Sequence, residues 1–189
     1  MATRDLPRAA RAIDEFLDAM GLSGDPSIVG TGARVAEAWD SELLAGTEVD
    51  VARLFADEAW VTSKPGALVV LREVSVATTC PHHLMPALGE ATIAYLPGRK
   101  VAGLGTLARA LHALARRLTL QEELGQRVVD ALHEHLHARG AACRLRLRHS
   151  CLAARGERER AIVETIAASG TMAPGGEDSA LLSLALGPG

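Results

Sequence analysis

The strongest constraint on the fold comes from nine residues, 143–151, which alternate between apolar or metal-binding residues and arginine or serine (CRLRLRHSC). Successive side chains of an extended strand point to opposite faces of a sheet. The alternation therefore predicts a strand with one arginine-rich face and one apolar face. On the apolar face, Cys143, Leu145 and Leu147 are followed by His149 and Cys151. We expect these last two side chains to address one common centre.

A second Cys/His motif, CPHH, lies far upstream at the end of another expected strand. Its Cys80 and His83 are three residues apart and can reach one centre from a turn. The two motifs together supply three zinc-type ligands and two further imidazoles, as a catalytic zinc site requires. If Cys80, His83 and Cys151 bind Zn²⁺, a fourth position stays open for a water molecule whose pKa falls toward ~7.

The two remaining imidazoles, His82 and His149, would then lie beside the metal. Two thiolate ligands already neutralise the charge of the zinc ion, which makes it a weaker Lewis acid than a site of three histidines. Activation of the substrate by a neighbouring acid therefore gains importance. A histidine can supply that proton near neutral pH.

Other residues of the same types have simpler explanations. Cys143 has no histidine close by in the sequence, so we expect a small buried hydrophobe. His133, His135 and His137 resemble a metal-binding tract, but on a helix only His133 and His137 lie on the same face. We therefore expect these histidines to lie on a solvated helix face. Two groups of arginines can each form either a polar surface or an anion-binding surface, and the sequence does not decide between these roles. They are the pair Arg116 and Arg117 and the row Arg144, Arg146 and Arg148.

The spacing of apolar residues predicts helices first and a mixed region afterwards. Helical spacing covers residues 6–20, about 33–44 and about 51–60. The mixed region then gives, in order, strands at 67–80 and 90–96, two leucine-striped helices between 103 and 140, and strands at 143–151 and 161–168. This order predicts an α+β fold in which a four-stranded antiparallel sheet carries both helices on one face.

Three regions are expected from this pattern: an N-terminal helical region at 1–60, a catalytic domain at 61–172 and a C-terminal tail at 173–189. The tail has only a weak apolar stretch at 181–186. A four-stranded sheet has two open edges, and assembly into a closed ring of subunits would satisfy them.

Composition excludes several classes of function. The 189 residues carry a formal net charge of −3 and only 3% aromatic residues, so no basic and aromatic tract predicts nucleic-acid binding. No apolar run is long enough to span a bilayer, and the first residues do not form a signal peptide. Three cysteines do not make a disulfide framework, which indicates a reducing, cytoplasmic compartment.

Five segments in a fixed order resemble the GTP cyclohydrolase I family, which has the tunnelling fold (T-fold). They are TGARVAEAW, CPHHLMP, YLPGRKVAGLGTLAR, RRLTLQEEL and RHSCLAARG, and the similarity runs from about residue 25 to 172. The resemblance implies zinc ligands at Cys80, His83 and Cys151 and catalytic imidazoles at His82 and His149. It also implies a guanine-binding element at Gln121 and Glu122 and triphosphate-binding residues at Arg109 and Arg155.

The resemblance implies a reaction as well. Water adds to C8 of GTP, His82 assists by protonating the ring nitrogen, and the imidazole ring opens to a formamide. A second hydrolysis releases formate, and rearrangement of the ribose gives 7,8-dihydroneopterin triphosphate. The family assembles as a decamer of two pentameric rings with active sites shared between subunits. The implied partners are thus a small-molecule substrate and further copies of the chain, with no nucleic acid and no membrane.

The chain departs from the family pattern mainly near the expected phosphate pocket. Pro81 stands where the family has Glu, Gly105 and Thr106 stand where it has Ser and Lys, and Glu123 stands where Arg is typical. The loss of a hydroxyl and an ammonium group weakens charge-assisted binding of phosphate. Three interpretations stay open: a GTP cyclohydrolase, a paralogue for a less phosphorylated or modified purine, and a non-catalytic zinc protein that binds pterins or purines.

Overall fold

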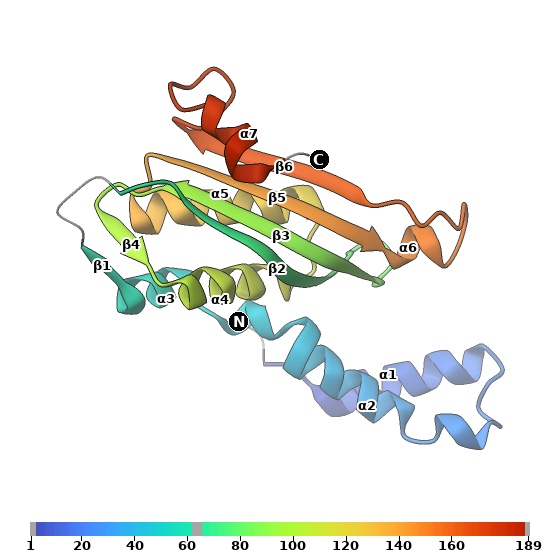
Figure 1. Cartoon of the computed structure of the whole chain (residues 1–189). Coiled ribbons are helices and arrows are strands. Elements are labelled where there is room, and N and C mark those ends of the chain that lie inside the picture. Colours follow the sequence, from blue (N-terminus) through green and yellow to red (C-terminus); the bar gives the residue numbers. More distant parts are fainter. Residues whose placement is uncertain (1–2, 62–65, 188–189) are drawn as a thin grey trace.

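A four-stranded antiparallel sheet forms the centre of the protein in the computed structural model, which describes residues 3–61 and 66–187. The strand order is β2-β3-β5-β6 (Figure 1). The strands are β2 (Val69–Thr79), β3 (Pro86–Leu96), β5 (Gly140–His149) and β6 (Val163–Gly170). The predicted α+β fold is confirmed, and β2 and β6 form the two edges of the sheet.

Two helices, α4 (Leu104–Ala115) and α5 (Gln121–Leu136), cover one face of this sheet (Figure 1). Their leucine stripes meet the apolar face of β5 and β3 and form the main core. Leu111, Leu124, Leu145 and Leu147 are fully buried there. Each such side chain stabilises the fold by about 1.5–3 kcal/mol relative to exposure, and this core fixes the strand ends that carry the site.

The opposite face of the sheet is polar over much of its area. Arg146 lies between two carboxylates, with 3.1 Å from Nη1 to Glu90 Oε1 and 3.1 Å from Nε to Glu164 Oε2. The arginine row of β5 therefore belongs to a polar sheet face with acidic partners on β3 and β6. Of the two roles that the sequence left possible for this row, the structure supports the polar surface.

The C-terminal segment adds a short helix, α7 (Ala180–Leu186), which lies on this second face at one end of the sheet (Figure 1). Ala185 and Leu186 pack there against Met172 and the sheet in a second, smaller core. Arg72 of β2 donates to the carbonyl oxygen of Ala185 over 2.5 Å. The stretch expected to be weakly apolar is thus a helix held to the sheet.

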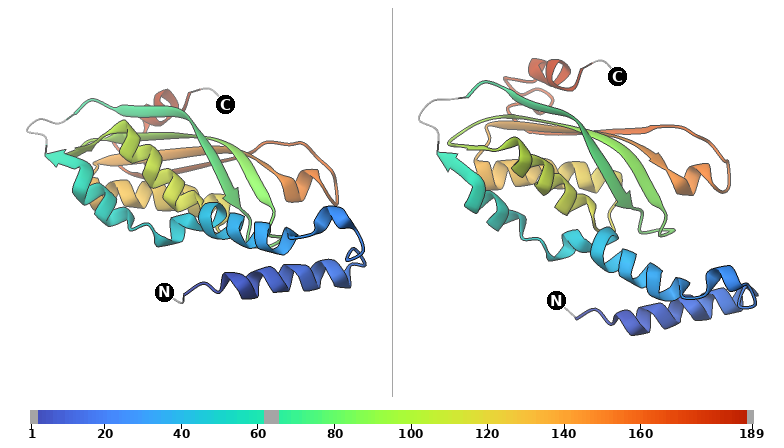
Figure 2. Two further views of the ribbon diagram at one scale, coloured as in Figure 1. Left: turned by 90° about the horizontal axis from the view of Figure 1, so that it is seen from below. Right: turned by 60° about the horizontal axis from the view of Figure 1, so that its bottom comes forward.

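The N-terminal part begins with two helices that project from the sheet (Figure 2). Helix α1 (Leu6–Ala19) packs against α2 (Thr31–Ala38), and none of its residues is buried. The chain continues through η1 (Pro26–Ile28), η2 (Trp39–Leu43), η3 (Ala45–Glu48) and α3 (Val51–Glu58). Phe55 of α3 is 1% exposed within the main core, where α3 packs against α4 and α5. The region boundaries expected at 60 and 172 stay predictions.

Several strand boundaries differ from the predicted ones, which were 67–80, 90–96, 143–151 and 161–168. Strand β3 begins at Pro86 instead of Glu90, and β5 ends at His149, so Cys151 lies in the short helix α6 (Ser150–Ala153). The physical reason is the pairing partner: His149 pairs with Ala87, one residue from the start of β3. Beyond that point β5 has no neighbour to continue the ladder, and the chain turns into a helix.

A small second sheet joins β1 (Ala59–Val61) to β4 (Lys100–Ala102). Among the described residues, no helix has both the length and the apolar character that a membrane crossing requires.

Candidate metal centre

The first two candidate ligands lie in the turn between β2 and β3. The N–H of Cys80 donates to the carbonyl of Met85 over 3.1 Å, and the N–H of Leu84 donates to the carbonyl of Cys80 over 3.0 Å. Leu84 has a φ of 54°, a left-handed conformation that few leucines adopt. These bonds close the turn and bring His83 back toward Cys80.

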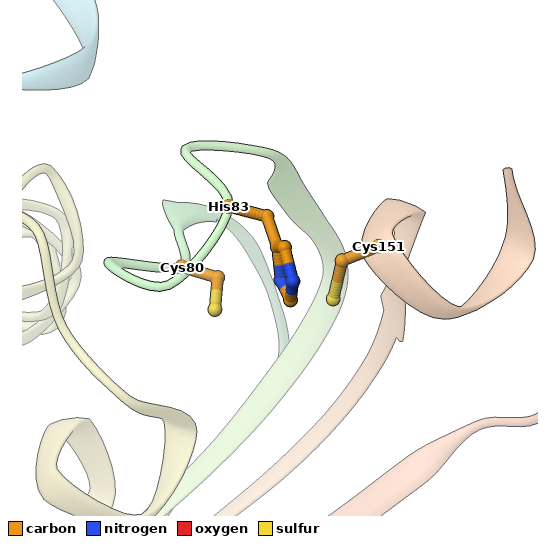
Figure 3. A group of neighbouring side chains, drawn as sticks. All are labelled: Cys80, His83 and Cys151. Carbon is orange, nitrogen blue, oxygen red and sulfur yellow. The ribbon is translucent and has the colours of Figure 1, made fainter. Parts of the chain in front are cut away.

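Cys80, His83 and Cys151 converge on one point from two separate segments. Their ligand atoms all lie within 4.8 Å of one another, and Cys80 and Cys151 flank the ring of His83 (Figure 3). Two cysteines and one histidine are a donor set found in catalytic zinc sites, where a fourth position stays available. The residues therefore fit a zinc ion. Cys151 reaches the cluster from α6 and not from the strand, which corrects the sequence analysis.

His149, the last residue of β5, is held by Gln121 at the start of α5. Its Nε2 lies 2.8 Å from Gln121 Oε1. The amide nitrogen of Gln121 lies 3.1 Å from the Leu145 carbonyl and 3.0 Å from the Val163 carbonyl. Since both carbonyls only accept, the Gln121 amide must face them with its NH₂ group. His149 therefore donates from Nε2 and, when neutral, keeps Nδ1 as its acceptor.

Gln121 is 2% exposed, so its hydrogen bonds cannot be replaced by water. We expect Gln121→Met to lower the free energy of unfolding by about 1–3 kcal/mol, because two strand carbonyls lose a buried donor. Urea unfolding followed by circular dichroism measures this change. Gln126→Met serves as the control, since the Gln126 side chain donates to Asp130 on the exposed side of the same helix. Equal stability of the two variants would contradict the buried role of Gln121.

The cluster borders a pocket of about 290 Å³. Most of the residues predicted for the site line this pocket: Cys80, His82, Gln121, Glu122, His149 and Cys151. The other residues that line the pocket were not predicted from the sequence, because uncharged side chains of these types do not indicate a catalytic or binding role. They are Thr78, Ala87, Thr119, Leu120, Leu152 and Val163. Glu122 is exposed in the first turn of α5, where a helix favours negative charge.

The two predicted phosphate-binding arginines lie in different places. Arg155 follows α6, is exposed, and its Nη1 lies 3.5 Å from the Cys151 carbonyl, at the side of the metal cluster. Arg109 of α4 does not line the pocket of its own chain. It forms an ion pair with Glu58, the last residue of α3, a contact that the sequence analysis missed. A hydrogen bond from Thr106, and secondarily Arg109, lowers the pKa of Glu58.

The remaining cysteine and histidines stand apart from the centre. Cys143 is completely buried, and burial raises the pKa of its thiol to about 12, so it stays a neutral hydrophobe as predicted. His135 packs against the Phe55 ring with 5.9 Å between centroids. In the part of the chain that the structure describes, Cys80, His83 and Cys151 form the one group of three such residues close enough to hold a metal ion.

Comparison with known proteins places this chain in a family. Residues 9–182 match the family model described as GTP cyclohydrolase I. The chain is 35% identical over 182 residues to GTP cyclohydrolase 1 of Leifsonia xyli subsp. xyli, covering 95% of both chains. It is 39% identical over 167 residues to GTP cyclohydrolase 1 of Corynebacterium glutamicum strain R, covering 87% of this chain and 84% of the relative.

A third relative, GTP cyclohydrolase 1 of Chromobacterium violaceum, is 40% identical over 147 residues, covering 75% of this chain and 68% of the relative. Among solved structures, the archaeosine synthase QueF-Like in its apo form aligns at a TM-score of 0.43 and 18% identity, over 57% of this chain and 97% of that one. On the family match across residues 9–182 and these identities, the chain belongs to the GTP cyclohydrolase I family, a family of enzymes.

Proposed function

We propose that this protein is a zinc-dependent GTP cyclohydrolase. It opens the imidazole ring of GTP at C8, releases formate and forms 7,8-dihydroneopterin triphosphate. The observation that carries the proposal is the convergence of Cys80, His83 and Cys151 beside a pocket that two further histidines and Glu122 line, in a chain of this family. A cytoplasmic location agrees with three cysteines that form no disulfide.

In this proposal Cys80, His83 and Cys151 hold the zinc ion. When bound there, zinc supplies Lewis-acid chemistry, which activates water for attack on C8. The turn between β2 and β3 provides two of these ligands and α6 provides the third. The folded sheet therefore determines whether the ligands meet, so metal binding and folding of this end of the sheet should be coupled.

The two histidines handle protons in the pocket. His82 is exposed in the turn and can protonate the ring nitrogen of the purine as the ring opens. His149 is oriented by Gln121, which occupies its Nε2 and leaves Nδ1 to exchange a proton with water or substrate. A ring that is already oriented loses less conformational freedom when the substrate binds.

Glu122 recognises the guanine base. Its carboxylate can accept two hydrogen bonds in parallel, from N1–H and from the 2-amino group of guanine. Adenine offers no such pair of donors on that edge, so the carboxylate selects guanine. The position of Glu122 at the rim of the pocket, one residue from the buried Gln121, supports this role.

The phosphates require Arg155 and Arg109. Arg155 lies beside the metal ligands, whereas Arg109 lies outside the pocket of its own chain. We therefore propose that Arg109 serves the site of a neighbouring subunit in a homo-oligomer, a decamer of two pentameric rings. The open edges of β2 and β6 are available for joining the sheets of adjacent subunits.

A second candidate function is hydrolysis of the same ring in a guanine compound with fewer phosphates or a modified base. The observation that favours it is the pairing of Arg109 with Glu58, together with Gly105 and Thr106 in place of a serine and a lysine. Formate release separates the candidates when zinc-loaded protein is given GTP, GDP, GMP and guanosine in parallel. Formate with a pterin product from GTP supports the first; turnover only of compounds without a triphosphate supports the second. Silence on all four contradicts the first candidate and, for the second, excludes guanine compounds with an unmodified base.

A further inference from the structure

A three-residue cluster outside the pocket joins α3 to the start of α4. Thr106 Oγ1 donates to Glu58 Oε2 over 2.6 Å, and the Arg109 guanidinium bonds to the same oxygen. Thr106 is 3% exposed, so its hydroxyl cannot turn toward solvent. Arg109 and Glu58 side chains remain partly open, at 55% and 37% exposure. The cluster therefore presents an arginine at the surface that already carries an anionic partner.

The sequence near Arg109 makes room for this arrangement. A Cβ atom at Gly105 would lie 3.2 Å from Arg109 Nη1, so a side chain at that position would crowd the guanidinium as it folds toward Glu58. Thr106 supplies the hydroxyl that orients the carboxylate. Thr106 thus orients the Glu58 carboxylate that Arg109 contacts, and Gly105 leaves the guanidinium room to reach it.

A carboxylate and a phosphate compete for the same guanidinium donors. Both accept charge-assisted hydrogen bonds in a planar, often bidentate arrangement. The hydrogen bond from Thr106 favours the ionised form of Glu58. A phosphate group that approaches Arg109 must therefore displace Glu58 or bind beside its negative charge, and either requirement weakens binding. Selectivity often arises from such repulsive elements as much as from attraction.

We propose that Glu58 is a specificity-determining residue that competes with substrate phosphates for Arg109 and so reduces the preference for GTP over guanine compounds with fewer phosphates. The inference rests on the proposed function, which assigns Arg109 to the phosphates. It goes beyond that function because it names the residue that determines how strongly the preference for a substrate depends on its number of phosphates.

Binding of inorganic tripolyphosphate tests the competition without turnover. Calorimetric titration of the zinc-loaded full chain at 0.15 M salt compares wild type, Glu58→Gln and Asp57→Asn. The control removes the same charge from the neighbouring residue, whose carboxylate pairs with Arg53 on the exposed side of α3. We expect Glu58→Gln to bind tripolyphosphate about fivefold more tightly, the scale of one exposed ion pair, and Asp57→Asn to match wild type within twofold. Equal affinities of both variants would overturn the inference.

Two further variants show whether the effect passes through Arg109. Thr106→Val removes the hydroxyl that orients Glu58 and should give part of the gain. The double variant Glu58→Gln/Arg109→Ala should lose the gain completely, and a double variant that keeps it would refute competition for Arg109. With substrates, the ratio of kcat/KM for GTP to that for guanosine should rise about fivefold in Glu58→Gln. Absence of turnover in wild type would contradict the proposed function alone, because tripolyphosphate binding decides the role of Glu58 independently.

Discussion

Replacement of Cys151 by alanine is expected to abolish both metal binding and cyclohydrolase activity. The variant removes one of three ligand atoms that lie within 4.8 Å of one another, and the two that remain come from a single turn. A catalytic metal contributes several kcal/mol to stabilisation of the transition state, so kcat/KM with GTP should fall by roughly a thousandfold or more. Mass spectrometry measures the loss of bound metal, and an assay of formate release measures the loss of activity.

Cys143→Ala is the matched control for this variant. Cys143 lies on the same strand as His149 but is buried in the core, where its thiol stays protonated. The control should keep about one zinc ion per chain and lose only stability, because a small apolar group is removed from a packed core. Full metal occupancy in Cys151→Ala, or loss of metal in Cys143→Ala, would refute the proposed ligand set.

The second large effect is expected from Glu122→Gln. The amide has nearly the same shape as the carboxylate but carries no charge and offers one acceptor where guanine presents two donors. Sites built around such hydrogen bonds reject a mismatched partner strongly. We expect kcat/KM with GTP to fall by at least about a hundredfold, the loss of two charge-assisted hydrogen bonds. Zinc content should stay at the wild-type value, because Glu122 is not a ligand.

Glu123→Gln provides the comparison for Glu122. Glu123 is the next residue of α5, is exposed, and pairs with Arg127 one turn later on the helix. It does not line the pocket, so its replacement should change kcat/KM by less than about twofold, as is usual for exposed ion pairs. Similar losses in both variants would indicate a general effect of charge on α5 and would remove guanine recognition from Glu122.

Much of the fold follows from periodicity in the sequence. The alternation at Cys143, Leu145 and Leu147 corresponds to a buried sheet face, and the leucine stripes of α4 and α5 cover it. The pattern could not locate the end of β5, because a strand ends where its neighbour ends, and that neighbour begins at Pro86. Strand pairing is a property of the tertiary structure, whereas alternation is local.

The site was predictable to a similar depth. Residue type and spacing in the sequence predict the three metal ligands Cys80, His83 and Cys151, and the structure brings their ligand atoms together. The contacts that position other groups have no comparable signal. Gln121 meets His149 across 28 residues, and Glu58 meets Arg109 across 51. Glutamine and glutamate are common at exposed positions, so only the fold reveals which of them face a histidine or an arginine.

The central claim is that the centre formed by Cys80, His83 and Cys151 opens the imidazole ring of GTP. The most direct test is a titration of metal-free protein with Zn²⁺, in which formate released from GTP is measured against zinc bound per chain. We predict that the rate of formate release rises in proportion to bound zinc and levels off at about one ion per chain, as expected for a single three-ligand site. Full activity without metal, or a zinc-saturated protein that releases no formate from GTP, would contradict the claim.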